Sequence, residues 1–135
     1  MTRNAAIKLV SSYLRLVEQR ALDKATILLA PGVVIVFPGG GRFESLQDQV
    51  AASQMRFRRV QKAFEDFDVL DAGDNTIVYV RGTLEGEDLS GLPFDGVRFV
   101  DRFEIHSGLI TRHEVWNDIA ESLPISTAKR PPDSA

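Results

Sequence analysis

The spacing of apolar residues changes near residue 63, and this change constrains the fold more than any other feature of the chain. Upstream of it, apolar residues recur at steps of three and four, as in Ile7, Val10, Leu14 and Val17, which is the period of an amphipathic helix. Downstream, segments rich in β-formers alternate with turn-forming stretches. A block of helices followed by a block of strands predicts an α+β domain, with helices packed on a mainly antiparallel sheet.

The predicted elements follow from these two periods. Ser45, with Asp48 three residues later, is typical of a helix start. We expect one domain at 1–123 and a flexible tail containing prolines at 124–135. Helices are predicted at residues 4–20, 22–29 and 45–61, a buried strand at 33–37, and four further strands at 64–72, 76–85, 94–106 and 109–118.

Composition excludes several classes of protein. The chain has no cysteine, so it holds neither a disulfide nor a thiolate metal site. Its net charge of −3 argues against binding of a nucleic-acid backbone. Charged residues interrupt the first twenty positions, so this segment is predicted to be neither a signal peptide nor a membrane span. We therefore expect a cytoplasmic protein with no nucleic-acid or membrane partner.

Three segments together resemble the nuclear transport factor 2-like superfamily, in particular its SnoaL-like polyketide cyclase and ketosteroid isomerase-like branch. The segments are 13–17 with Asp23 and Ala25, then 34–38, then 103–116 through Gly108-Leu109-Ile110. The resemblance implies a cystatin-like cone, with the helices and the curved sheet around a pocket for a small organic molecule. It also implies a homodimer. No cofactor and no metal ion are expected.

The functional residues of these families carry over only in part. The ketosteroid isomerase resemblance places Tyr13 as a phenol facing a substrate oxygen, but puts Phe37 and Phe99 where two acidic residues are needed. Steroid isomerisation by that mechanism is therefore not expected. The resemblance to epoxide hydrolases keeps Asp118, although its Arg and Asp partners fall on Gly82 and Leu84.

Pairing of the last two strands predicts the inner wall of the pocket. A two-residue turn at Ser107-Gly108 pairs residues whose numbers sum to 215, and side chains alternate between the two faces of a sheet. In this register four cross-strand pairs share one face of the sheet: Phe103 with Arg112, Asp101 with Glu114, Phe99 with Trp116, and Val97 with Asp118. The resemblance implies that this face is the concave one. A one-residue bulge would instead turn outward the side chains that one of the two strands contributes to these pairs.

The opposed carboxylates, Asp101 and Glu114, suggest acid–base chemistry. Two carboxyl groups this close repel when both are ionised, so one tends to keep its proton. Within walls formed by Phe37, Phe99, Phe103 and Trp116, the pair offers an acid and a base for enolisation, cyclisation or dehydration. Asp118 is an alternative base, with Tyr13 steadying an oxyanion. Equally, Arg112 with Asp101 and Glu114 could form an ordinary ion-pair cluster at the rim.

Several other signals have simple structural interpretations. His113 is expected on the convex face, where the residues of the last two strands suit a subunit contact. Basic residues Arg56, Arg58, Arg59 and Lys62 fit a solvated C-terminal end of the third helix, with an anion-recognising pocket mouth as the alternative. Two functions stay open: an isomerase, cyclase or lyase acting on a small apolar carbonyl compound, and a non-catalytic ligand-binding or oligomerisation module.

Overall fold

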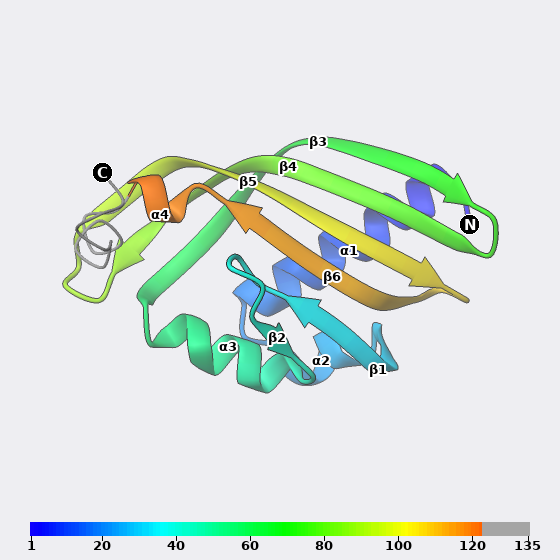
Figure 1. Cartoon of the computed structure of the whole chain (residues 1–135), viewed down its shortest axis with the longest axis horizontal. Coiled ribbons are helices and arrows are strands. Elements are labelled where there is room, and N and C mark those ends of the chain that lie inside the picture. Colours follow the sequence, from blue (N-terminus) through cyan, green and yellow to red (C-terminus); the bar gives the residue numbers. More distant parts are fainter. Residues whose placement is uncertain (123–135) are drawn as a thin grey trace.

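The computed structural model describes residues 1–122, which form helices and strands around one six-stranded sheet (Figure 1). The strand order is β2-β1-β6-β5-β4-β3; β1 and β6 are parallel and the other neighbours are antiparallel. The elements are α1 (Arg3–Glu18), α2 (Leu22–Thr26), β1 (Leu29–Val36), β2 (Arg42–Phe43), α3 (Leu46–Gln54), β3 (Phe57–Ala72), β4 (Asn75–Asp88), β5 (Pro93–His106), β6 (Leu109–Asn117) and α4 (Ile119–Ser122). The tail predicted at 124–135 lies outside the described residues.

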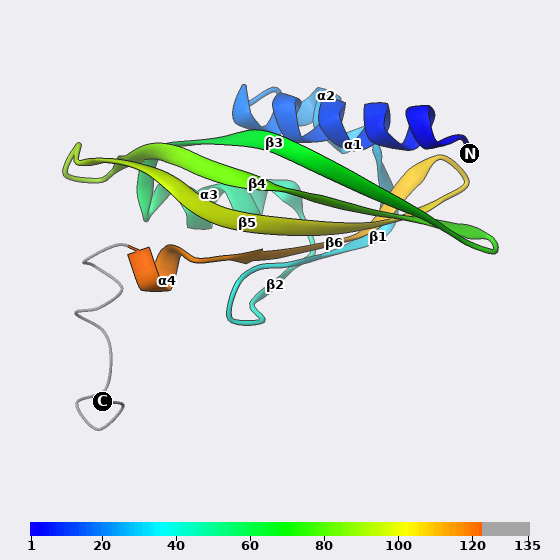
Figure 2. The same ribbon diagram turned by 90° about the horizontal axis from the view of Figure 1, so that it is seen from above.

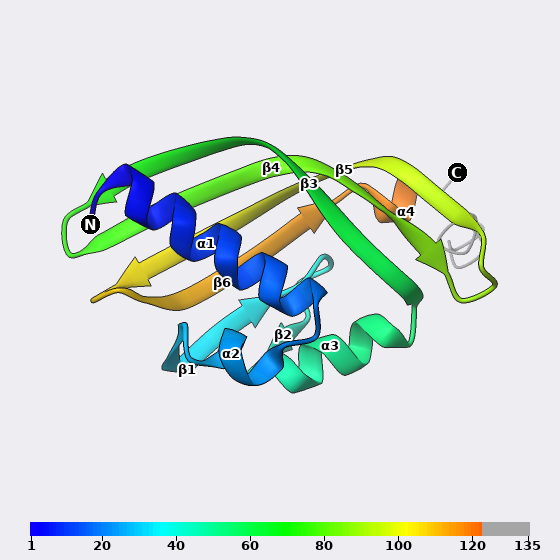
Figure 3. The ribbon, with the colours of Figure 1, turned by 180° about the vertical axis from the view of Figure 1, so that it is seen from behind.

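The helices α1 and α2 lie on one face of the curved sheet (Figure 2). Seen from behind, α1 crosses the sheet diagonally, and α3 lies near the end of the sheet where β3 begins (Figure 3). Between these layers the core gathers the apolar stripe of α1, including Val10 and Leu14, and inward residues of the strands such as Ile35 and Phe103. The predicted α+β architecture, with helices on a mainly antiparallel sheet, is confirmed.

Hydrogen bonds at the helix ends explain where the helices begin and stop. The side chain of Thr2 accepts a hydrogen bond from Ala5 N at 3.1 Å, and Ser45 caps α3 in the same way through Asp48 N. At the other end of α1, Arg20 adopts a left-handed conformation, with φ 60°. The amides of Arg20 and Ala21 return to Val17 and Leu16, which closes the helix as a Schellman turn.

The third helix is shorter than predicted, and the strand after it is longer. Helix α3 ends at Gln54 and β3 starts at Phe57, whereas the helical period predicted a helix to residue 61. Residues Val60, Lys62 and Phe64 are partly buried and alternate with exposed neighbours, which is the period of a strand. The correction brings Lys62 from a supposed solvated helix end onto the inner face of the sheet.

Two glycines allow the long strands to bend sharply. A Cβ atom on Gly82 would lie 1.8 Å from the carbonyl oxygen of Ala63, and one on Gly86 would lie 2.1 Å from that of Arg59. Register shifts interrupt the β3–β4 pairing near both contacts. Since only glycine permits such an approach of the two backbones, these positions fix where the sheet curves over the helices.

A β-bulge in β6 overturns the register predicted for the last hairpin. His106 pairs with Leu109 and Ile105 with Ile110 as expected, but Glu104 then pairs with Arg112, which leaves Thr111 as an extra residue. The Thr111 hydroxyl donates to Glu104 O at 3.2 Å. Because side chains alternate, this single insertion exchanges the two faces of β6 from Arg112 onward.

Candidate functional site

A partly enclosed cavity of about 450 Å³ lies between the helices and the sheet. It is walled by α1, α3, the β1–β2 connection, the first half of β3, the end of β6 and α4. Its apolar lining includes Phe37, Phe43, Phe57, Val60, Leu84 and Val115, and its polar lining includes Tyr13, Glu18, Arg20, Arg56, Lys62 and His113. A volume of this size suits a small organic molecule.

Next to the cavity, Asp101 joins two side chains that line it. The Asp101 side chain is 0% exposed, and its Oδ2 atom contacts both Lys62 Nζ and His113 Nε2, the latter at 3.1 Å. Lys62 Nζ also lies 4.9 Å from the centre of the Phe99 ring. A buried carboxylate needs such partners, because an isolated charge in an apolar interior is costly.

These contacts fix the charge states of the buried groups. Burial raises the pKa of Asp101, but Lys62 and the His113 hydrogen bond outweigh it and hold that pKa below its ordinary value. Burial lowers the pKa of His113, against the opposing effect of Asp101. His113 is therefore neutral near pH 7. Since an ionised Asp101 only accepts, Nε2 of His113 carries the proton and Nδ1 keeps a free lone pair.

Two aromatic rings hold the imidazole in place. His113 stacks on Phe103 with ring centres 4.1 Å apart and meets Tyr13 edge-on at 5.8 Å. Tyr13 is 1% exposed, and burial followed by the charge of Asp101 raises the pKa of its phenol, so the hydroxyl stays protonated. It is thus available as a hydrogen-bond donor across the neutral pH range.

Buried polar atoms without a partner concentrate at this site. Among the side chains of the described residues, these atoms are Tyr13 Oη, His113 Nδ1 and Asp101 Oδ1. Leaving such an atom unpaired costs on the order of 1–3 kcal/mol, so each one needs an explanation. All three atoms are covered in this structure. A ligand in the cavity therefore reaches them only when neighbouring side chains move aside.

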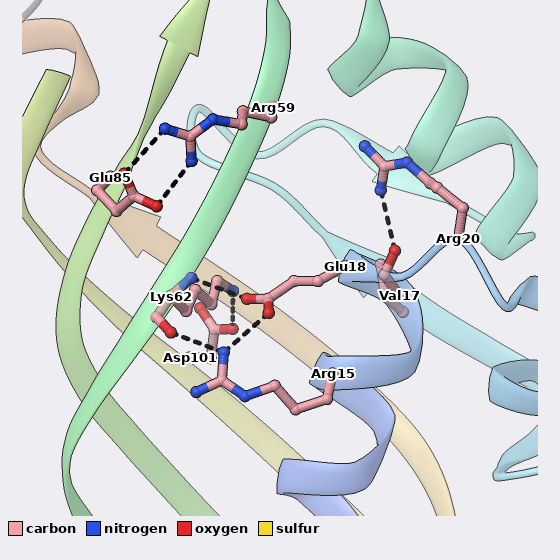
Figure 4. Close-up of polar contacts among 8 residues, drawn as sticks. All are labelled: Arg15, Val17, Glu18, Arg20, Arg59, Lys62, Glu85 and Asp101. Atoms are coloured by element: carbon pink, nitrogen blue, oxygen red, sulfur yellow. Dashed lines mark hydrogen bonds and ion pairs between the residues drawn. The ribbon is translucent and has the colours of Figure 1, made fainter. Parts of the chain in front are cut away.

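Contacts between α1 and β3 set the position of Lys62 (Figure 4). Glu18 Oε2 accepts from Lys62 N at 2.8 Å, and Arg15 Nη1 donates to Lys62 O at 2.8 Å. Arg15 and Glu18 also pair with each other at 2.8 Å. The backbone N–H and C=O groups of Lys62 are thus both hydrogen-bonded to side chains of α1. These bonds fix the backbone of Lys62 where its ammonium group contacts Asp101.

Four predicted site residues lie away from the cavity, and the bulge in β6 explains three of them. Trp116 is 49% exposed, so the prediction that it faces the hollow is wrong. Glu114 opposes Arg102 rather than Asp101, and Arg112 Nε bonds Glu114 Oε1 at 2.9 Å on the outer face. The fourth, Asp118, pairs with Arg98 at 2.5 Å in an exposed bridge. The opposed carboxylate pair does not exist.

The remaining predicted pocket residues are partly or fully buried on the helix-covered side. Phe37 lines the cavity. Val97, Phe99 and Phe103 belong to the core, 0–3% exposed, and are not part of the cavity lining formed by residues 1–122. Phe103 still supports the site, because it stacks on His113. Val97, Phe99 and Phe103 therefore support the residues that line the cavity without lining it themselves.

Sequence reasoning did not place His113 and Lys62 in the candidate site, although both line the cavity. His113 was expected on the convex face, but it is 4% exposed and lines the cavity. One signal favoured the observed register: it places Arg112 and Glu114 on the outer face, where both are partly exposed, whereas the predicted register turns both inward. For Lys62, the alternation of Val60, Lys62 and Phe64 was the signal for an inner strand position.

Solved structures similar to this chain share one fold. A protein from Burkholderia pseudomallei, described as nuclear transport factor 2-like and of unknown function, matches with a TM-score of 0.72 at 20% identity, over 90% of this chain and 95% of that one. A protein described as a SnoaL-like polyketide cyclase from Jannaschia gives 0.68 at 20%, over 96% and 94%. A ketosteroid isomerase-like protein from Catenulispora acidiphila, in complex with trimethylamine, gives 0.71 at 16%, over 92% and 97%.

These matches define the class of fold. The chain has the nuclear transport factor 2-like fold, as the sequence resemblance predicted. Among the structures that share it are two proteins described as polyketide cyclases, one of them as SnoaL-like, and a protein described as having a ketosteroid isomerase-like fold. No protein-family model matches the sequence, and the comparison with curated proteins gives no match. Within residues 1–122, no helix is long and apolar enough to cross a membrane.

Proposed function

We propose that this protein binds a small, mostly apolar carbonyl compound in the cavity and catalyses an isomerisation, cyclisation or elimination by acid–base chemistry on its own side chains. His113 is the general base, Asp101 orients it, and Tyr13 is the hydrogen-bond donor to the substrate oxygen. Steroid isomerisation by paired carboxylates is not expected, because Phe37 and Phe99 occupy the acidic positions.

One observation carries this proposal: a neutral imidazole whose Nδ1 has no hydrogen-bond partner and a protonated phenol whose hydroxyl has none lie in the wall of one mostly apolar cavity. A base with a free lone pair and a donor with a free proton are the two groups that enolisation needs. The Asp101 carboxylate fixes the tautomer of His113, as an orienting acid does for a catalytic histidine in general.

The proposed step begins with a substrate whose carbonyl oxygen accepts a hydrogen bond from Tyr13 Oη. His113 Nδ1 removes a proton from the carbon next to the carbonyl, and the electron pair of that C–H bond forms the enolate. The imidazolium, stabilised by Asp101, returns the proton to another carbon or to a leaving group. No proton is lost or gained overall in an isomerisation.

Proton exchange tests the base without knowledge of the natural substrate. In D₂O, 2-tetralone serves as the probe, and NMR follows the replacement of its C1 protons by deuterium. We expect the protein to accelerate exchange above the rate in buffer with free imidazole, and His113→Gln to abolish the acceleration. Tyr13→Phe should lower the rate by about 100-fold, the usual effect of losing one oxyanion donor.

The outward carboxylates provide matched controls. Glu114→Gln and Asp118→Asn, which the predicted register made catalytic, should leave the exchange rate unchanged because both lie away from the cavity. The rate should rise with pH through the His113 pKa, which lies below 6.5, and level off by neutral pH. Equal rates for wild type and His113→Gln would remove the catalytic assignment.

Ligand binding without turnover is the second candidate function. The enclosure of His113 Nδ1 and Tyr13 Oη favours it, because a substrate touches neither atom unless the wall opens. This alternative predicts that 2-tetralone binds to the wild-type protein, detectable by line broadening, while its exchange rate stays at the buffer value. A catalyst predicts both binding and exchange.

A further inference from the structure

The mouth of the cavity carries two arginines that form no ion pair with any residue of the described range 1–122. Arg20 follows α1 and Arg56 follows α3, and both are exposed residues that line the cavity. Of the other charged lining residues, Lys62 is neutralised by Asp101, and Glu18 by Arg15. The cavity therefore has an excess of positive charge at its open side.

The contacts of the two guanidinium groups leave most of their donors free. Arg20 Nη1 donates to Val17 O at 3.0 Å, folding back over the end of α1 (Figure 4). The Arg56 guanidinium lies 5.8 Å from the centre of the Phe57 ring. Within residues 1–122, neither arginine forms a salt bridge. A guanidinium has five N–H donors, so both can still bind an oxyanion.

The backbone at Arg20 adds an independent observation. Its φ of 60° lies in the left-handed region, at the position of a Schellman turn where glycine is preferred. A long charged side chain there is strained relative to glycine, and strain of this kind concentrates at binding sites. The turn places the side chain at the cavity, where Arg20 forms part of the lining.

We infer that the ligand of this cavity carries a carboxylate at one end of an apolar body, and that Arg20 and Arg56 bind this carboxylate at the mouth. The apolar body then lies deeper, against Phe37, Phe57 and Leu84. Planar guanidinium groups match the geometry of a carboxylate, which accepts two parallel hydrogen bonds. This inference names the ligand class of the site proposed above, and its test requires binding only.

The test compares two probes of nearly the same shape, 2-naphthoate and 2-naphthamide, by isothermal titration calorimetry. We expect the wild-type protein to bind 2-naphthoate at least about tenfold more tightly, as charge-assisted hydrogen bonds predict. Arg20→Gly and Arg56→Gln should each remove most of this preference and leave binding of 2-naphthamide unchanged. Raising the NaCl concentration should weaken only the binding of 2-naphthoate.

Controls separate a binding defect from a folding defect. Arg58→Gln changes the charge equally at a neighbouring exposed position that does not line the cavity, and should keep the preference for 2-naphthoate. Arg20→Gly should not lower the melting temperature, because glycine relieves the left-handed strain. Equal affinities for the two probes, no binding of either, or an unchanged preference in Arg20→Gly and Arg56→Gln would overturn the inference. Loss of proton exchange alone would overturn only the proposed catalysis.

Discussion

Replacing Lys62 with methionine tests how the buried charges of this site support one another. Lys62 Nζ contacts Asp101 Oδ2, and the two side chains are 16% and 0% exposed. Methionine keeps most of the apolar stem of lysine but removes the ammonium group. The change therefore leaves the Asp101 carboxylate buried with only the neutral His113 beside it.

The expected cost follows from the burial of the pair. Removing one partner of a buried ion pair typically destabilises a protein by about 3–5 kcal/mol. Because Lys62 is partly exposed, we expect a loss at the lower end of this range, about 3 kcal/mol. For a domain of this size, 1 kcal/mol shifts the melting temperature by about 3–4 °C, so we expect a decrease of about 10 °C at pH 7.

The pH dependence gives the sign of the effect. In the wild type the pKa of Asp101 is lowered, so its contribution is present above the ordinary pKa of 3.8 and is lost as pH falls through the folded-state value. Without Lys62, burial dominates and raises the pKa of Asp101. The contribution of Asp101 then favours the folded state in acid and is lost as pH rises through the raised pKa. The difference in stability between the variant and the wild type should therefore become smaller toward pH 4.

Thermal melts followed by circular dichroism at pH 4 and pH 7 measure the effect. Lys8→Met removes an equal charge from an exposed position of α1 and is the control. The double variant Lys62→Met/Asp101→Leu should recover most of the lost stability, because no unpaired charge remains. A decrease at pH 7 no larger than that of Lys8→Met, or no recovery in the double variant, would refute the reasoning.

Three further measurements address other parts of the structure. Gly82→Ala should destabilise the protein by about 3 kcal/mol or more, because its Cβ would lie 1.8 Å from Ala63 O, whereas Gly41→Ala, with open space around it, should be nearly neutral in urea unfolding. In ¹⁵N NMR, His113 should be the neutral Nε2–H tautomer at pH 7. Its pKa should lie below 6.5, and its contribution to stability should be complete above pH 6.5 and decline as pH falls through that pKa; a charged ring at pH 7 would contradict this. Sedimentation should show the homodimer predicted from the sequence, and Trp116→Asp should weaken it; a monomeric wild type would contradict that prediction.

The register of β6 shows why the candidate site was only partly predictable. The alternation along β5 placed Asp101 among apolar residues on one face, and the structure buries them together with it. The turn predicted at Ser107-Gly108 also gave the first two pairs of the hairpin correctly, His106 with Leu109 and Ile105 with Ile110. The bulge at Thr111 then exchanged the two faces of β6. No local propensity distinguishes a strand with one extra residue from a regular one. His113 and Trp116 exchanged faces as a result.

Amino-acid spacing alone predicted the order of the main helices and strands, the α+β class and the buried set on β5, because hydrophobic period is a property of neighbouring residues. The nuclear transport factor 2-like fold was predicted from the resemblance to that superfamily. Only the tertiary structure decided which groups meet at the cavity: Lys62 from β3, His113 from β6 and Tyr13 from α1. Their meeting depends on where α3 stops and on one inserted residue in β6. Both are settled by packing between elements distant in sequence, where a shift of one residue turns a side chain from solvent to the interior.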